Sequence, residues 1–208
     1  MRELMRGVAV GFALLLVAGA IASRAGWADL AIPRAASTGP WLIARASGFA
    51  AFIALSFDVI AGLVLSTRVG GRRLARGQLV ELHSWLSPLA LALVLGHAMV
   101  LLADGYIRFD ALDLMIPFVA PYRGAAVGLG VISAYVALVV HASFAFRRRL
   151  GTKLWRRLHY LSFLAFGGGA LHGILAGTDS RQPWAVVLYA APLALATMLV
   201  VRRVAPAR

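Results

Sequence analysis

Long runs of apolar residues are the feature that most constrains how this chain folds. Six runs approach or exceed the roughly 20 mostly apolar residues that a helix needs to cross the hydrocarbon core of a bilayer. They cover residues 7–23, 46–67, 80–103, 124–146, 158–176 and 183–201. Because the runs are continuous rather than alternating, they favour helices over the strands of a membrane barrel. The sequence therefore predicts an all-α, polytopic bundle of six transmembrane helices.

The composition supports a membrane protein over a large soluble domain. Only 14% of the residues are charged and the mean hydropathy is +0.83, whereas about a quarter of a soluble domain is charged. The first run follows "MRELMR" and could be confused with the apolar core of a signal peptide. Since it is longer than that core usually is, we expect it to be retained as a helix. Residues 1–40 then hold the first helix and an outer loop, and residues 41–208 hold a transmembrane domain.

The basic residues predict the orientation of the bundle. Fifteen of the 21 Lys and Arg lie on one side of the six helices, and six lie on the other side. The positive-inside rule places the more basic side in the cytoplasm, so both termini are expected there. Attraction to anionic lipids accounts for the basic connections, and docking of an acidic soluble protein is the alternative. Nucleic-acid binding is not expected, because no folded basic module accompanies the charge.

Four of the five histidines bracket two of the apolar runs. His83 and His97 are 14 residues apart in the third run, and His159 and His172 are 13 residues apart in the fifth. In the predicted topology these two helices run parallel, and a rise of 1.5 Å per residue separates the histidines of each helix by roughly 20 Å. The imidazoles should therefore meet in two pairs at matching depths: His83 with His159, and His97 with His172.

Two imidazoles facing each other across an apolar gap are the ligand set of a b-type haem. The chain has no cysteine, which excludes thiolate metal sites, iron–sulfur clusters and covalent c-type attachment. A spacing of 13 residues turns a regular helix to nearly its opposite face, so the fifth helix needs a bend, a local change of pitch, or ligands that approach from different sides. We expect a bend at the glycines 167–169, with Pro88 bending the third helix. Gly96 and Gly173 are expected to let a flat macrocycle approach the backbone, ordinary helix packing being the alternative.

The two His pairs, on the third and fifth of six helices, resemble the ferric reductase-like transmembrane superfamily over residues 40–200. This superfamily includes NADPH oxidases, ferric reductases and the haem-binding membrane subunit of periplasmic methionine sulfoxide reductase. The resemblance implies two haem b groups, the inner one on His83 and His159 and the outer one on His97 and His172. It also implies electron transfer from cytosolic flavin to an acceptor outside, in a bacterial inner membrane. Residues 41–208 are then its diheme domain.

Other residues are weaker candidates for cofactor contacts. Arg45 and Arg123 are predicted at the depth of the outer haem propionates, and Trp155, Arg156 and Arg157 at the depth of the inner ones. Bidentate pairing with carboxylates suits the arginines, although snorkelling explains them equally well. Phe163 or Phe166 is a candidate for a ring between the haems, with simple packing as the favoured alternative. Asp58 is a buried acid that either pairs with a Ser, His or Arg or relays protons. His141 is expected to make a neutral polar contact, the alternatives being a group that supports a ligand or a spare ligand.

The sequence also predicts partners. No GxGxxG unit follows the sixth run, so a separate cytosolic flavoprotein or flavin reductase, with its own or a shared flavin, is expected to donate electrons. The expected acceptor is an outer reductase subunit; Fe³⁺ ranks second and superoxide production third.

The rival hypothesis from another class is a metal-ion transporter that uses the histidines as Zn²⁺ or Cu ligands. Zinc requires three or four clustered ligands, which two distant pairs do not supply. A scaffold without cofactors is the remaining alternative.

Overall fold

A computed structural model describes residues 39–67 and 76–204, and these residues are almost entirely helical. The elements are α2 (Gly39–Thr67), α3 (Arg76–Leu101), α4 (Ala111–Met115), α5 (Gly124–Ala145), α6 (Arg147–His159), α7 (Leu161–Ala176) and α8 (Pro183–Val204). Within these residues, five helical stretches are long and apolar enough to cross a membrane, α6 and α7 together forming one of them. They correspond to the second to sixth predicted runs. The first predicted helix, 7–23, lies outside the described residues.

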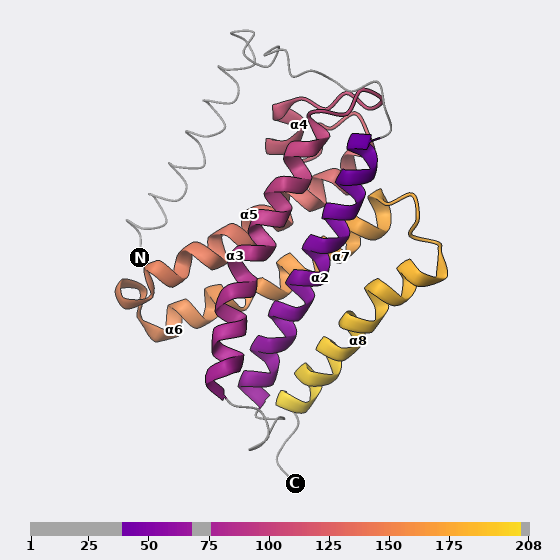
Figure 1. Ribbon diagram of the computed structural model, residues 1–208. Coiled ribbons are helices and arrows are strands. Elements are labelled where there is room, and N and C mark those ends of the chain that lie inside the picture. Colours follow the sequence, from indigo (N-terminus) through magenta and orange to yellow (C-terminus); the bar gives the residue numbers. More distant parts are fainter. Residues whose placement is uncertain (1–38, 68–75, 205–208) are drawn as a thin grey trace.

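Helix α2 is the centre of the packing. It runs beside α3, contacts α7, and is flanked on another side by α8, while α5 pairs with α7 (Figure 1). On the α7 and α8 sides its core is aromatic: Phe52 stacks on Phe166 with ring centroids 5.6 Å apart, and the Tyr189 ring lies 5.0 Å from Phe52. Such ring pairs bury a large apolar area. This cluster fixes α2 and α7 relative to each other.

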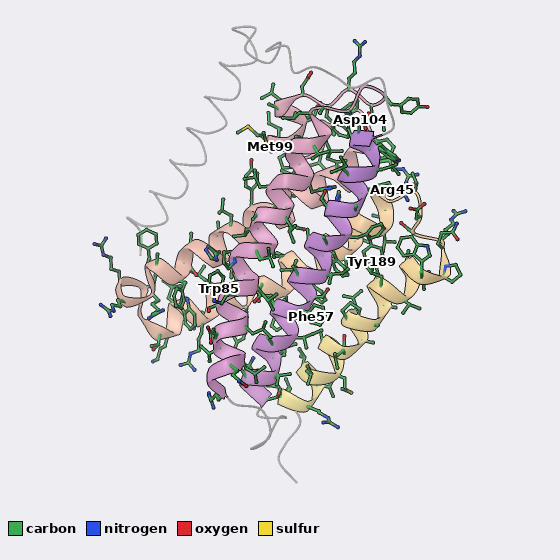
Figure 2. All side chains as sticks on the ribbon, in the orientation of Figure 1. Arg45, Phe57, Trp85, Met99, Asp104 and Tyr189 are labelled. Carbon is green, nitrogen blue, oxygen red and sulfur yellow. The ribbon has the colours of Figure 1, made fainter. Side chains whose placement is uncertain are left out.

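The outer faces of the helices carry large apolar side chains. Phe57 on α2, and Trp85 and Met99 on α3, are each more than half exposed (Figure 2). In a soluble protein such a surface would promote aggregation, but in a bilayer lipid covers it. These helices also lack a distinct polar face. Lipid around the bundle explains this, because it favours apolar side chains on the outer faces.

The bend that the sequence predicts in the fifth run does not lie at its glycines. The glycines 167–169 lie within α7, so the expectation of a bend there is wrong. Tyr160, between α6 and α7, keeps right-handed helical angles (φ −65°, ψ −18°), and the non-helical backbone nearby is at Gly151 within α6 (φ 73°, ψ 159°). A Cβ on Gly168 would lie 2.3 Å from the Ser133 hydroxyl oxygen. The glycine there provides close α5–α7 packing, as small residues commonly do between membrane helices.

The segment between α3 and α5 is held by acidic side chains. Asp104 is buried, and its Oδ1 accepts backbone N–H bonds from Tyr106 at 2.8 Å and Ile107 at 3.3 Å. Asp110 and Asp113 form a capping box at the start of α4. These acids close turns and cap a helix.

Candidate functional site

The structure brings the four histidines together in the two expected pairs. The ring centroids of His83 and His159 are 6.0 Å apart, and those of His97 and His172 are 6.2 Å apart. The ring planes are nearly perpendicular within each pair, at 88° and 72°. One pair therefore lies toward each end of the same helices.

The 13-residue spacing does not prevent both pairs from forming. His159 is the last residue of α6, and His172 lies on α7. Although 13 residues turn a regular helix to nearly its opposite face, the ring contacts bring both imidazoles to the histidines of α3.

The separation of the rings suits axial ligation of one metal ion. A metal–nitrogen bond of about 2 Å, plus about 1 Å from nitrogen to ring centre, places two axial imidazoles roughly 6 Å apart. The two helical segments that carry the pairs hardly touch: α3 packs on α2, and α7 packs on α5 and α2. The donor set and the width of the gap thus fit a planar macrocycle held by one imidazole on each face.

Three of the four histidines have their Nδ1 atom fixed by a backbone carbonyl. His97 Nδ1 lies 2.7 Å from the Ala44 oxygen, and His172 Nδ1 lies 2.8 Å from the Ala126 oxygen. His83 Nδ1 lies 3.1 Å from the backbone oxygen of Asp58. Because a carbonyl only accepts, Nδ1 carries the proton and Nε2 keeps its lone pair for a metal.

A glycine follows each of these carbonyls by four residues. A Cβ on Gly48 would lie 3.1 Å from the His97 ring, one on Gly62 3.3 Å from the His83 ring, and one on Gly130 2.7 Å from His172 Nδ1. The missing side chain thus makes room for each imidazole beside the carbonyl it binds. Sequence reasoning missed these glycines, although Gly48 and Gly62 are 14 residues apart, as His83 and His97 are.

His159 is supported differently. Its ring stacks on Trp155, with centroids 5.3 Å apart and planes inclined by 26°. Trp155 in turn contacts the edge of Phe144 on α5. Of the residues predicted near the inner pair, Trp155 is therefore in direct contact with it, whereas Arg156 and Arg157 are exposed on α6.

An apolar cavity of about 230 Å³ adjoins the outer pair. It lies between α2, α3, α5 and α7, and small residues form much of its wall. His97 and His172 line it, together with Gly48 and Gly130, and Arg45 is at its edge. Ligand sites of this kind are mostly apolar with few polar groups, and the apolar wall of the cavity suits the face of a porphyrin.

The two predicted outer arginines are placed differently. Arg45 lines the cavity and forms an ion pair with Asp179, in the loop after α7 (Figure 2). Arg123 donates to the Leu175 oxygen at 2.6 Å and binds the carbonyl end of α7, a position where a cation is favourable. Arg45 is thus the better placed for a propionate, and Arg123 has a structural function that the sequence did not indicate.

The remaining candidates have defined contacts. His141 forms a 2.9 Å hydrogen bond with the Ser87 hydroxyl, so the expected polar contact between helices is present. Phe166 is in the core cluster with Phe52, and Phe163 packs against the same cluster. Asp58 is buried against His83.

A family model described as the ferric reductase like transmembrane component matches residues 47–170. The match covers more than half of the chain. The chain belongs to the ferric reductase-like transmembrane family. Comparisons with curated proteins and with solved structures find no match.

Membership of the ferric reductase-like family makes this an integral, multi-pass membrane protein and an oxidoreductase-related component, and it suggests transmembrane electron transfer. The matched segment contains His83, His97 and His159, and it ends two residues before His172. The match assigns no role to any of the four, and the pairing of His172 with His97 rests on the sequence spacing and on the ring contact.

The geometry gives no support to a zinc or copper transporter. No group of three His, Asp or Glu side chains within residues 39–67 and 76–204 is arranged to hold a metal ion. Two opposed imidazoles alone leave a zinc ion short of its usual three or four protein ligands.

Proposed function

We propose that this ferric reductase-like protein is a diheme cytochrome b that carries electrons across the membrane. The observation that supports it best is the pair of opposed imidazoles near each end of one helical gap. A b-type haem bound in each pair would supply one-electron redox chemistry. His83 and His159 would hold the inner group, and His97 and His172 the outer one.

The rest of the chain orients the ligands and excludes water. The carbonyls of Ala44, Asp58 and Ala126 fix the imidazoles with Nε2 directed away from the backbone. Arg45 at the outer cavity and Trp155 at the inner pair are the residues best placed to contact the edges of the macrocycles. No side chain needs to act as a general acid or base in this function.

The charge distribution supports the orientation that we propose for the two sites. The basic α6 adjoins the inner pair, so the positive-inside rule places that pair at the cytoplasmic side of a bacterial inner membrane, with both termini cytoplasmic. Electrons then pass outward to a separate reductase subunit, or to Fe³⁺ as the second candidate.

Transmembrane conduction is testable in vesicles that contain the haem-loaded protein. Ferricyanide is enclosed, dithionite is added outside, and potassium with valinomycin compensates the transferred charge. We expect the enclosed ferricyanide to be reduced much faster than in empty vesicles, and His97→Ala to remove the acceleration. Reduction at the rate of empty vesicles by fully loaded wild type would contradict the proposal.

The proposed donor is an acidic cytosolic flavoprotein or flavin reductase that docks on α6. Arg147, Arg148 and Arg149 are exposed there, followed by Lys153, Arg156 and Arg157. Opposite charge mainly accelerates encounter and is screened by salt.

Replacing Arg147, Arg148 and Arg149 by glutamine is expected to slow reduction by a flavin reductase several-fold at low salt. Reduction by dithionite should stay unchanged, and the difference from wild type should vanish at high salt. Stopped-flow absorbance measures both rates. Equal slowing with both reductants would contradict docking and indicate damage to the fold.

A further inference from the structure

Asp58 is a charged side chain inside the membrane beside a proposed ligand. It lies on α2, whose only other charged residue is Arg45, about three and a half turns away. Its side chain is almost completely buried. Oδ1 lies 2.6 Å from His83 Nδ1, closer than the backbone oxygen of the same residue at 3.1 Å. Burying such a group is costly unless it has a partner, and His83 is that partner.

The two ends of the molecule differ in this contact. At the outer pair, both Nδ1 atoms bind backbone oxygens, those of Ala44 and Ala126, and the side chains of these residues are methyl groups. Ala44 and Asp58 are otherwise equivalent. They are 14 residues apart, each offers its carbonyl to a histidine of α3, and each is followed four residues later by a glycine. The carboxylate is the feature that distinguishes the inner position.

A carboxylate on Nδ1 changes the imidazole as a ligand. Its charge lies 2.6 Å from Nδ1, whose N–H donates to the backbone oxygen of the same residue, and it makes the ring a stronger electron donor through Nε2. Its negative charge also acts through an apolar medium, where electrostatic interactions are stronger than in water. Both effects stabilise the more positive, oxidised state of an iron bound at Nε2. Neutral carbonyls at the outer pair have a weaker effect of the same kind.

We propose that Asp58 is a positioning and tuning residue that makes the inner haem site the more reducing of the two. This inference rests on the proposed diheme function. An electron then moves from the site of lower midpoint potential to the site of higher potential as it passes outward. Asp58 would thus give the conduction path its preferred direction.

The test is a spectroelectrochemical titration of the Asp58→Asn variant. Asparagine keeps the shape and an oxygen acceptor but removes the charge. We expect the ratio of oxidised to reduced inner haem at a fixed potential to fall about tenfold, a rise in midpoint of about 59 mV for one electron. The outer midpoint should stay where it is. Repeating the substitution in a His97→Ala background, or in His172→Ala if that folds better, assigns the shift to the inner site.

Ser56→Ala is the matched control, because Ser56 is buried on the same helix and its hydroxyl binds the Phe52 oxygen rather than a histidine. Both midpoints should be unchanged in this control. Two retained haems with an unmoved inner midpoint would overturn the inference, as would equal shifts at both sites. Loss of the inner haem from Asp58→Asn would also overturn it, because Asp58 would then hold the ring rather than tune it. Absence of haem from the wild type would instead contradict the proposed function.

Discussion

Replacing His97 by alanine is expected to leave one bound haem per chain instead of two. His97 and His172 face each other at 6.2 Å between ring centroids, so substitution of either would remove one of the two proposed ligands of the outer haem. His83 and His159 are roughly 20 Å away along the helices, and their contacts with Asp58 and Trp155 do not involve the outer pair. The inner site should therefore keep its haem and its low-spin spectrum.

The measurement is haem per chain on purified protein, together with the reduced-minus-oxidised spectrum. His141→Ala is the matched control, because this histidine also lies in a membrane helix but binds the Ser87 hydroxyl. It should keep both haems. Two haems retained in His97→Ala, or one lost from His141→Ala, would show that the ligands are assigned wrongly.

The second large effect is expected from Gly130→Ala. The new methyl group would lie 2.7 Å from His172 Nδ1 and 2.9 Å from both the Cε1 and the Cγ atoms of the same ring. The ring must move, and the 2.8 Å hydrogen bond to the Ala126 oxygen is lost. Overpacking costs about 1–3 kcal/mol, and loss of a partner that orients a ligating histidine typically weakens metal affinity about 10–100-fold. We expect the outer site to lose affinity for haem by such a factor while the inner site is unaffected.

Titration of haem into apoprotein measures this effect. Gly167→Ala is the control on α7, because a Cβ there meets nothing within 4 Å. It should bind two haems with the affinities of the wild type. If Gly130→Ala binds as tightly as Gly167→Ala, the glycine is not required for the position of His172.

The helices and the His pairs could be predicted because they follow from periodic properties of the sequence. Apolar length identifies a membrane helix, and the nearly equal spacings of 14 and 13 residues on parallel helices place His83 opposite His159 and His97 opposite His172. The position of the non-helical residue could not be predicted in the same way. Glycines 167–169 are poor helix formers in isolation, yet packing between α5 and α7 keeps them helical, and the backbone leaves helical angles at Gly151 in α6 instead.

The surroundings of the histidines were less predictable, because they depend on contacts between helices. The acceptors of Nδ1 are backbone oxygens, which any residue type supplies, so residue identity does not reveal them. The only sequence signal of these contacts is the glycine that follows each acceptor by four residues. The same holds for Arg123, whose partners are the carbonyls that end α7. Asp58 was recognisable as a buried acid, but its partner could be assigned only once α2 and α3 were aligned.

The central claim is that one chain holds two haems, each between a pair of imidazoles. The most direct test is the visible spectrum of the purified wild-type protein, oxidised and reduced, with haem counted per chain after expression with ample haem. The account predicts two low-spin b haems per chain. A colourless protein, or a single haem at full loading, would contradict it.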